Sequence, residues 1–317
     1  MGRQAGFIIS KILELLATLF LVSLLTFVAF SVIPGDTAQV ILGPDASQAQ
    51  LDALRAELGL DRPMIVQYLS WLGGLFTFNL GNSAAFGTSV SGLIVERLPV
   101  TIGMSLIALI FVIVISYPLA ILSARRPGKL LDQVFSVLGH VLFAIPPFAL
   151  SLIIITLASL IFSGFRAGQY YSPADNFPGF IGCLVLPSFC IALPKIAMTF
   201  KYMRSSIIEQ NASEYVKNAK GHGLSDLRIL VKHVLPNSNV SSITVISIVL
   251  SDILAGSLIV EQVFNLPGLG RLLLAGIARR DFPLLSGMVF YIAFITVLLY
   301  FAADILGSIA DPRIRLK

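Results

Sequence analysis

The chain has 317 residues, of which 56% are hydrophobic and only 12% are charged. Soluble domains carry about 25% charged residues, so this composition excludes a single soluble core of this length. The net charge of +5 comes from basic residues spread over short segments without a continuous basic patch, so we expect a lipid bilayer as the surroundings and no nucleic-acid partner.

Six stretches carry at most one charge each, and each reaches the roughly 20 apolar residues that a helix needs to span a bilayer. Only helices and closed barrels satisfy their backbone groups in lipid, and the period-two alternation of a barrel is missing here. The first stretch is too long for a signal peptide and lacks its cleavage site, so we expect it to remain as a span. The predicted fold is an all-α membrane protein with six transmembrane helices at residues 15–33, 98–124, 133–165, 176–194, 234–260 and 282–310.

The distribution of Lys and Arg predicts the orientation of these spans. With the N-terminus inside, the cytoplasmic segments hold 14 of the 22 basic residues and the external segments hold seven. Basic residues concentrate on the cytoplasmic side, so both termini are predicted to be cytoplasmic. The chain then divides into an N-terminus with the first span (1–33), an external segment (34–97), a core of five spans (98–310) with a cytoplasmic loop (201–236), and a cytoplasmic tail (311–317).

The external segment contains one predicted amphipathic helix. Ser47 and Gln50 have the spacing of a capping box, leucines then recur at helical spacing, and Gly59 marks the stop. We expect this helix to pack on the outer ends of the spans. A docking surface for an external partner is the alternative.

The cytoplasmic loop predicts two short helices. Asn211 and Glu214 have the spacing of an N-cap and its third residue, and Gly223 permits the left-handed turn that ends such a helix. Ser225 is the predicted cap of the second helix, and Pro236 marks the change into the fifth span. Apolar residues recur at helical spacing on one face of each helix, namely Ala212, Tyr215, Val216 and Ala219, and then Leu227, Leu230, Val231 and Val234.

Three interpretations of this helix-turn-helix remain open from the residues alone. It could lie on lipid as a basic amphipathic element. It could pack against the protein's own spans as an inert loop. It could insert into a groove on a cytoplasmic partner.

The stretch EYVKNAKGHGLSDLRILVKHVLPN (214–237) resembles the cytoplasmic loop of ABC importer permeases. Their pattern is Glu-Ala-Ala, three residues, Gly, nine residues, a hydrophobic residue, one residue, and Leu-Pro. When the pattern is aligned on Gly223, the matching residues are Ala219, Gly223, Leu235 and Pro236, and the departures are Lys217, Asn218 and His233. The departures resemble the variant of the dipeptide/oligopeptide/nickel permease subfamily.

Other segments are similar to the same subfamily along nearly the whole chain. They are IPGD (33–36), LRAELGLDRPMIVQYLSWL (54–72), LGNS (80–83), ERLPVTI (96–102), VEQVFNLPGLGRLLLAGIARRDFPLLSG (260–287) and DPRIR (311–315). The weakest similarity is in the external loop 163–179.

The resemblance implies the type I ABC importer fold, in the cytoplasmic (inner) membrane of a bacterium or archaeon. The implied partners are a second homologous permease subunit, two ABC ATPase subunits and an extracytoplasmic substrate-binding protein. A coupling helix (212–224) would dock on the ATPase, and the implied coupling residues are Glu214, Tyr215, Ala219, Gly223, Leu224, Leu235 and Pro236. The implied cargo is peptide first, with nickel, metal chelates or glycans as alternatives.

ATP chemistry is expected from a partner rather than from this chain. The phosphate-binding pattern Gly-x4-Gly-Lys-Ser/Thr is absent from the sequence, so we expect no enzyme activity, catalytic residue, metal or cofactor here, with ATP and Mg bound by the ATPase subunits. The two cysteines, Cys183 and Cys190, lie in one apolar run and are predicted to be small core residues.

Ionisable residues in or near the spans are the remaining candidates for function. Lys195, His140 and Asp252 are candidates for the translocation path. The alternatives are an interhelical hydrogen bond, a contact with a partner subunit, or the ion relay of a stand-alone secondary transporter or channel. The missing inverted repeat argues against the last.

The stretch between the last two predicted spans also resembles the family. The candidates there for a gating or structural role are Glu261, Pro267, Gly268 and Gly270. The stretch NLPGLGRLL (265–273) is predicted to be a re-entrant segment or a loop turn.

Overall fold

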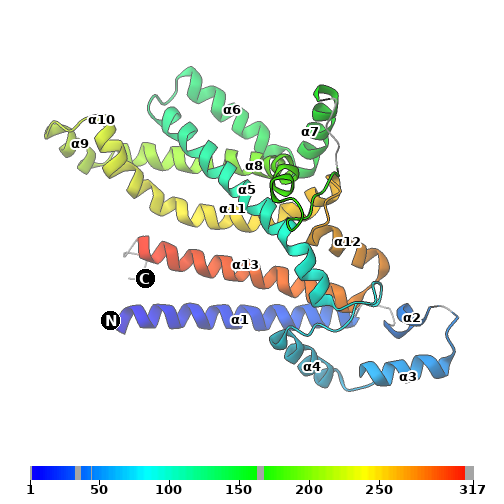
Figure 1. The fold of residues 1–317 in the computed structure, drawn as a ribbon. Helices are drawn as coiled ribbons and strands as arrows, with labels where there is room; N and C mark the ends of the chain where they lie inside the picture. Colours follow the sequence, from blue (N-terminus) through cyan, green and yellow to red (C-terminus); the bar gives the residue numbers. More distant parts are fainter. Residues whose placement is uncertain (1, 33–36, 44, 163–167, 311–317) are drawn as a thin grey trace. The chain divides into compact units, whose positions relative to one another are not determined.

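The computed structural model describes residues 2–32, 37–43, 45–162 and 168–310. In this part of the chain the only β-type pairing is one isolated antiparallel bridge between Asn82 and Ser89 (Figure 1). The helices are α1 (Gly2–Val32), α2 (Thr37–Leu42), α3 (Gln48–Leu58), α4 (Met64–Thr77), α5 (Val90–Ala124), α6 (Leu130–Ala144), α7 (Pro147–Ile161), α8 (Phe177–Asn211), α9 (Glu214–Gly221), α10 (Asp226–Ile229), the π-helical η1 (Leu230–Val234), α11 (Leu235–Val263), α12 (Leu269–Arg279) and α13 (Phe282–Ala310). The predicted all-helical class is confirmed for the described residues.

The chain divides into two compact units. Unit 1 comprises residues 101–266 and the two ends of the chain, and unit 2 comprises residues 9–100 and 267–298. These bounds differ from the predicted division into an external segment and a core, because unit 2 combines α1 and the segment after it with α12 and most of α13.

Long apolar helices match the predicted spans in number and place. Among the described residues, α1, α5, α8, α11 and α13 are long and apolar enough to cross a membrane, and the pair α6–α7 counts as a sixth span if it is taken as one. Large apolar side chains such as Phe20 and Ile110 are more than half exposed, as expected for surfaces that face lipid.

The third predicted span, 133–165, is not one straight helix. It breaks between α6 and α7, whose axes differ by 105°. Ile145 adopts an extended conformation, with φ −93° and ψ 123°, and Pro146 and Pro147 follow it. A proline lacks the N–H for the helical hydrogen bond and disfavours the helical conformation in the residue before it, so the break has a local cause.

The fourth predicted span, 176–194, is too short. The helix α8 continues through Lys195 to Asn211 and contains both Pro187 and Pro194. The charge of Lys195 suggested an end to the span. In the structure this charge is paired with a carboxylate on α11, so it does not mark the end of the helix.

Unit 1 is built around α8. This helix packs against α6, α7 and α11, and α11 also contacts α7 (Figure 1). More than half of the most apolar window of α8 is buried, which makes it the most buried candidate span in the structure's described part. The cytoplasmic loop was predicted to begin at residue 201, but α8 continues to Asn211, so the helix-turn-helix starts only after that residue.

Unit 2 contains an aromatic cluster that joins α1, α4 and α13. Trp71 of α4 lies 5.8 Å from Phe27 of α1 and 6.0 Å from Phe290 of α13, measured between ring centroids. The hydroxyl groups of Ser23 and Tyr68 are 2.9 Å apart in the same region. The predicted capping box of Ser47 and Gln50 is confirmed on α3, and Gly59 ends that helix with φ +69°. The helix α4 was not predicted.

Asp281 joins the two segments of unit 2 at the start of α13. Its buried carboxylate accepts hydrogen bonds from the hydroxyl of Ser83, from the backbone N–H of Ala85 at 3.0 Å and from that of Leu284 at 3.2 Å. The last bond is the N-cap bond of α13. These contacts were not predicted, because Ser83 and Ala85 lie 198 and 196 residues from Asp281 and no local pattern joins them.

Replacing Asp281 by Ala is expected to loosen unit 2. Each buried donor left without an acceptor costs about 1–3 kcal/mol. We expect a lower thermal midpoint in detergent and faster proteolysis within residues 83–89. Asp61→Asn, which removes an exposed carboxylate of unit 2, serves as the control and is expected to behave like the wild type. Equal proteolysis of both variants would contradict the role of Asp281 in holding the two segments of unit 2 together.

Candidate coupling site

The helix α9 begins one turn after α8 ends. Ser213, rather than the predicted Asn211, occupies the N-cap position, because α8 continues through Asn211. The hydroxyl of Ser213 donates to the carbonyl of Gln210 at 2.5 Å, and the hydroxyl of Tyr215 donates to the Gln210 side chain at 2.8 Å. These bonds fix the corner between the two helices.

Gly223 ends α9 as predicted. Its φ is +75°, a left-handed conformation that glycine adopts without a steric cost. The N–H of Leu224 donates to the carbonyl of Ala219 at 3.2 Å, and the N–H of Gly223 donates to that of Lys220 at 2.9 Å. The first bond is the long-range bond of a Schellman motif, which satisfies a carbonyl at the helix end.

The second helix of the loop is continuous with the fifth span. Ser225 occupies the predicted N-cap position, although its hydroxyl makes no capping bond there. Between α10 and α11 the chain forms one π-helical turn, in which the N–H of Leu235 donates to the carbonyl of Leu230. Pro236 follows directly, so the proline that was predicted to mark the boundary lies in the first turn of α11.

The apolar sides of both helices are buried against the protein's own spans. Val216 of α9 is 1% exposed and lies in one core with the ends of α5 and α8. Tyr215, Ala219, Leu224 and Leu235 pack at the edge of this core. The core itself consists of Ala120, Ala124, Phe200, Met203, Ile207, Val216, Ile229, Leu230 and Val234. Of the three interpretations, packing on the protein's own spans is confirmed for the apolar side.

Two residues of the predicted apolar face lie outside this core. Leu227 is 61% exposed and Val231 is 53% exposed, whereas Ile229 is buried. The prediction assumed a regular α-helix through the segment. The π-helical turn changes the spacing, so that Ile229 lies in the core together with Leu230 and Val234, which were predicted for this face.

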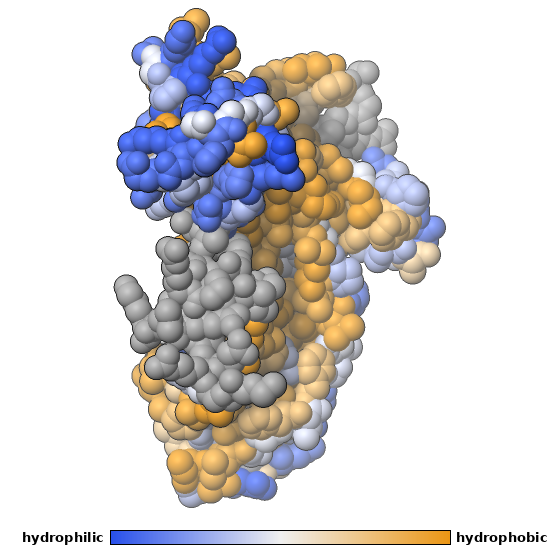
Figure 2. Space-filling model, turned by 90° about the vertical axis from the view of Figure 1, so that its left-hand side faces the viewer, coloured by the Kyte–Doolittle hydropathy of each residue, from blue (hydrophilic) through white to orange (hydrophobic). Residues whose placement is uncertain are grey.

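The outward side of the helix-turn-helix is mainly polar, with Leu227 and Val231 as exposed apolar residues. Lys217 pairs with Glu214 at 2.8 Å, and Lys220 pairs with Asp226 at 3.2 Å, with all four side chains exposed. Exposed pairs of this kind contribute little stability, so these charges are free to serve recognition. Figure 2 looks onto this end of unit 1, where hydrophilic side chains gather around α9 and α10.

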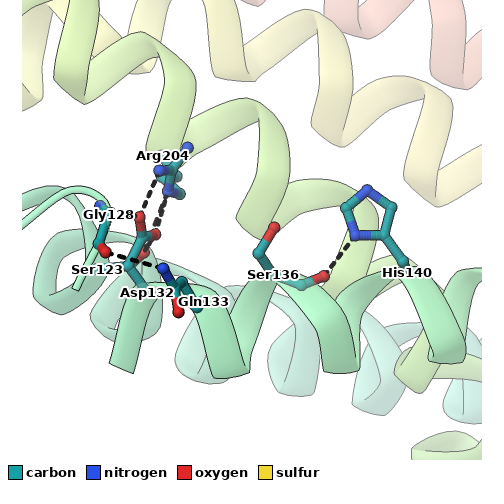
Figure 3. Close-up of polar contacts among 7 residues, drawn as sticks. All are labelled: Ser123, Gly128, Asp132, Gln133, Ser136, His140 and Arg204. Carbon is teal, nitrogen blue, oxygen red and sulfur yellow. Dashed lines mark hydrogen bonds and ion pairs between the residues drawn. The ribbon is translucent and has the colours of Figure 1, made fainter. Parts of the chain in front are cut away.

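A buried ion pair lies beside the core that holds α9. Asp132 at the start of α6 accepts two hydrogen bonds from Arg204 of α8, at 2.5 and 2.6 Å, and another from the hydroxyl of Ser123 of α5 (Figure 3). The N–H of Gly128 donates to the same carboxylate at 2.7 Å. From the sequence, Arg204 was predicted only as one of the cytoplasmic charges. The partners lie 72 residues apart, and no local pattern joins them.

The structure brings together two of the three candidate path residues. Lys195 of α8 lies 2.7 Å from Asp252 of α11, and their side chains are 16% and 44% exposed. The alternative of an interhelical hydrogen bond is therefore confirmed for this pair. His140 stands apart on α6, where its Nδ1 lies 2.6 Å from the carbonyl of Ser136 (Figure 3).

The residues assigned to a gating or structural role have separate surroundings. Glu261 is fully buried in unit 1, and its carboxylate accepts a hydrogen bond from Thr101 of α5 at 2.5 Å. In unit 2, Gly268 is the N-cap of α12, Gly270 is buried in the first turn of that helix, and Pro267 is partly buried. The predicted turn 265–273 is thus half helical, and its second part begins α12.

The described part of the chain contains no candidate metal site and no disulfide bond. No group of three His, Cys, Asp or Glu residues there is placed to hold a metal ion. Cys183 is partly buried and Cys190 is buried, and both are free thiols, as expected for small core residues.

Comparisons with known proteins show which family the chain belongs to. Residues 116–316 match the family model of the binding-protein-dependent transport system inner membrane component, and residues 4–105 match the model of the N-terminal part of such membrane components. The chain is 34% identical to a putative peptide transport system permease protein of Brucella abortus and to the oligopeptide transport system permease protein AppB of Bacillus subtilis, in each case over 98% of this chain and 99% of the relative. It is 29% identical, with the same coverage, to a probable peptide ABC transporter permease protein of Sinorhizobium fredii. The chain therefore belongs to the family of binding-protein-dependent transport system inner membrane components, the permeases of ABC transport systems.

Proposed function

We propose that this chain is the permease subunit of an ATP-driven importer that carries peptides delivered by an extracytoplasmic binding protein. The observation that carries the proposal is the helix-turn-helix of α9 and α10, whose apolar side is fixed to the ends of α5 and α8 and whose polar side is exposed. The printed names of the relatives, which are peptide permeases, support peptide over nickel, metal chelates or glycans as the cargo.

The orientation follows from the basic residues. We place both termini and the loop with α9 and α10 in the cytoplasm of a bacterium, with the chain spanning the cytoplasmic membrane several times. A second homologous permease subunit completes the transmembrane part, and two ABC ATPase subunits bind below it. ATP and Mg belong to those subunits, so this chain performs no catalysis.

The surface of this chain that docks on the ATPase is the outward side of the helix-turn-helix. The resemblance implies that the coupling helix docks on the ATPase, but Val216 on the apolar face of α9 is buried in this chain, so that face is not available to a partner. The exposed residues available to a partner are Glu214, Lys217, Lys220, Leu227, Arg228 and Val231. Tyr215, Ala219, Leu224, Leu235 and Pro236 then act indirectly, because they hold the two helices on the spans or shape their ends.

The ion pair of Lys195 and Asp252 is our candidate for the lining of the translocation path. A carboxylate in the hydrocarbon region that is 44% exposed in this chain would be costly against lipid, so it should face water or the second permease. His140 lies on a different helix and stays a separate candidate.

Replacing Leu227 by Glu is expected to weaken ATPase binding. The exposed leucine supplies apolar area at the proposed docking surface, and a charge there would need to be desolvated on docking. We expect about tenfold weaker binding, equivalent to about 1.4 kcal/mol. Leu58→Glu on α3, which also replaces an exposed leucine, is the matched control and should bind normally. Equal binding by both variants would contradict the docking surface.

Purification from the native membrane in mild detergent, followed by mass spectrometry, tests the proposed assembly. We expect this chain to be recovered with a second permease and ABC ATPase subunits. Recovery of the chain alone, active in transport without ATP, would support the alternative of a stand-alone transporter or channel.

A further inference from the structure

The ion pair of Asp132 and Arg204 is fully satisfied and lies where three helices meet. The carboxylate of Asp132 is 4% exposed and accepts four hydrogen bonds, two from Arg204, one from Ser123 and one from the N–H of Gly128. A carboxylate has about four acceptor positions, so this one is saturated. The donors come from α5, from the loop after it and from α8, and Asp132 itself belongs to α6.

The same two helices, α5 and α8, also hold α9. Ala124 follows Ser123 on α5, and Met203 precedes Arg204 on α8. Both Ala124 and Met203 belong to the core that buries Val216 of α9. Each of these two helices therefore carries a residue of the ion pair network directly next to a residue of the core that holds α9.

We infer that the pair of Asp132 and Arg204 is a clamp that holds the ends of α5, α6 and α8 together, so that a displacement of α9 moves them as one body. The hydrophobic effect is not directional, so apolar burial by itself does not fix the orientation of one helix end against another. A bidentate bond between Arg and a carboxylate fixes both distance and orientation. Opening the pair would leave the buried carboxylate of Asp132 without its compensating charge, so the clamp resists shear. This inference rests on the proposed function, since it assigns Asp132 and Arg204 a positioning role in coupling ATP hydrolysis to transport.

The first test uses the double variant Asp132→Asn with Arg204→Gln in the assembled complex with its ATPases. Removing both charges avoids an uncompensated buried charge and allows the variant to fold. We expect assembly, thermal midpoint and ATP hydrolysis close to wild type, but a loss of about tenfold in peptide taken up per ATP hydrolysed, within the usual range of coupling between sites. A role in stability alone would lower assembly and hydrolysis together and leave that ratio unchanged.

The second test uses Arg204→Lys, which keeps the charge but loses the bidentate geometry. We expect an intermediate loss of about threefold in peptide taken up per ATP, since coupling energies are graded by the contacts that carry them. Arg126→Gln removes an exposed cation near the clamp and serves as the matched control with unchanged coupling. If the double variant does not assemble, the result for Arg204→Lys decides.

The outcomes separate this inference from the proposed function. A wild-type ratio of uptake to hydrolysis in either assembled variant would overturn the clamp, as would a parallel loss of both activities. A wild-type complex without ATP-dependent uptake would contradict the proposed function itself, and the clamp with it.

Discussion

Replacing Gly223 by Val is expected to uncouple transport from ATP hydrolysis. The backbone at Gly223 has a φ of +75°, and an added Cβ atom would meet no atom within 4 Å, so we attribute the cost of the substitution to the backbone conformation. A left-handed conformation costs an L-residue about 1–2 kcal/mol, and a β-branched residue such as Val tolerates it least. The variant should relieve this strain by remodelling the turn after α9, which displaces the proposed docking surface. We expect peptide uptake to fall about tenfold or more, since 1.4 kcal/mol corresponds to a factor of ten.

Two further variants make this prediction specific. Asn tolerates the left-handed conformation, so Gly223→Asn should retain most of the uptake. Gly221 lies in α9 with open space around it, so Gly221→Ala should have no harmful effect and should favour the helix slightly. Uptake and ATP hydrolysis in reconstituted vesicles are the measurements. Normal ATP-driven uptake by the Gly223→Val variant would show that this turn has no role in coupling.

Replacing Asp252 by Ala is expected to have the second large effect. The change leaves the ammonium group of Lys195, now 2.7 Å from a carboxylate, without that partner. An unpaired lysine at the centre of a span costs up to about 3 kcal/mol. We expect a lower yield of assembled complex, measured by size-exclusion chromatography, and about tenfold lower uptake of a labelled peptide.

The neutral double variant Lys195→Gln with Asp252→Asn separates stability from transport. Without an uncompensated charge, assembly should recover, whereas uptake of peptides with charged ends should stay several-fold below wild type if the pair lines the path. Asp52→Asn breaks an exposed ion pair with Arg55 on α3 and is the matched control, with no effect on either measurement. Wild-type uptake in the double variant would show that the pair is a structural contact between α8 and α11 and does not line the path.

Local patterns predicted the features whose causes are local. The capping box at Ser47 depends on residues three apart, and the turn at Gly223 depends on one residue without a side chain. The candidate spans follow from the length of apolar runs. The break before Pro146 had an equally local signal in two adjacent prolines, but an apolar run without charges masked it.

Features that depend on contacts between distant residues could not be predicted in this way. Asp132 and Arg204 lie 72 residues apart, and Asp281 and Ser83 lie 198 residues apart. A single sequence shows such carboxylates only as isolated charges. The position of Leu227 was mispredicted for a different reason, because helical periodicity assumes a regular helix and the π-helical turn after α10 interrupts it.

Peptide uptake by proteoliposomes that contain this chain, a second permease and the ATPase subunits tests the central claim most directly. With a peptide-loaded binding protein outside and ATP inside, we predict uptake that stops when ATP is omitted and when the ATPases are left out. Uptake that continues without ATP and follows an ion gradient instead would contradict the account.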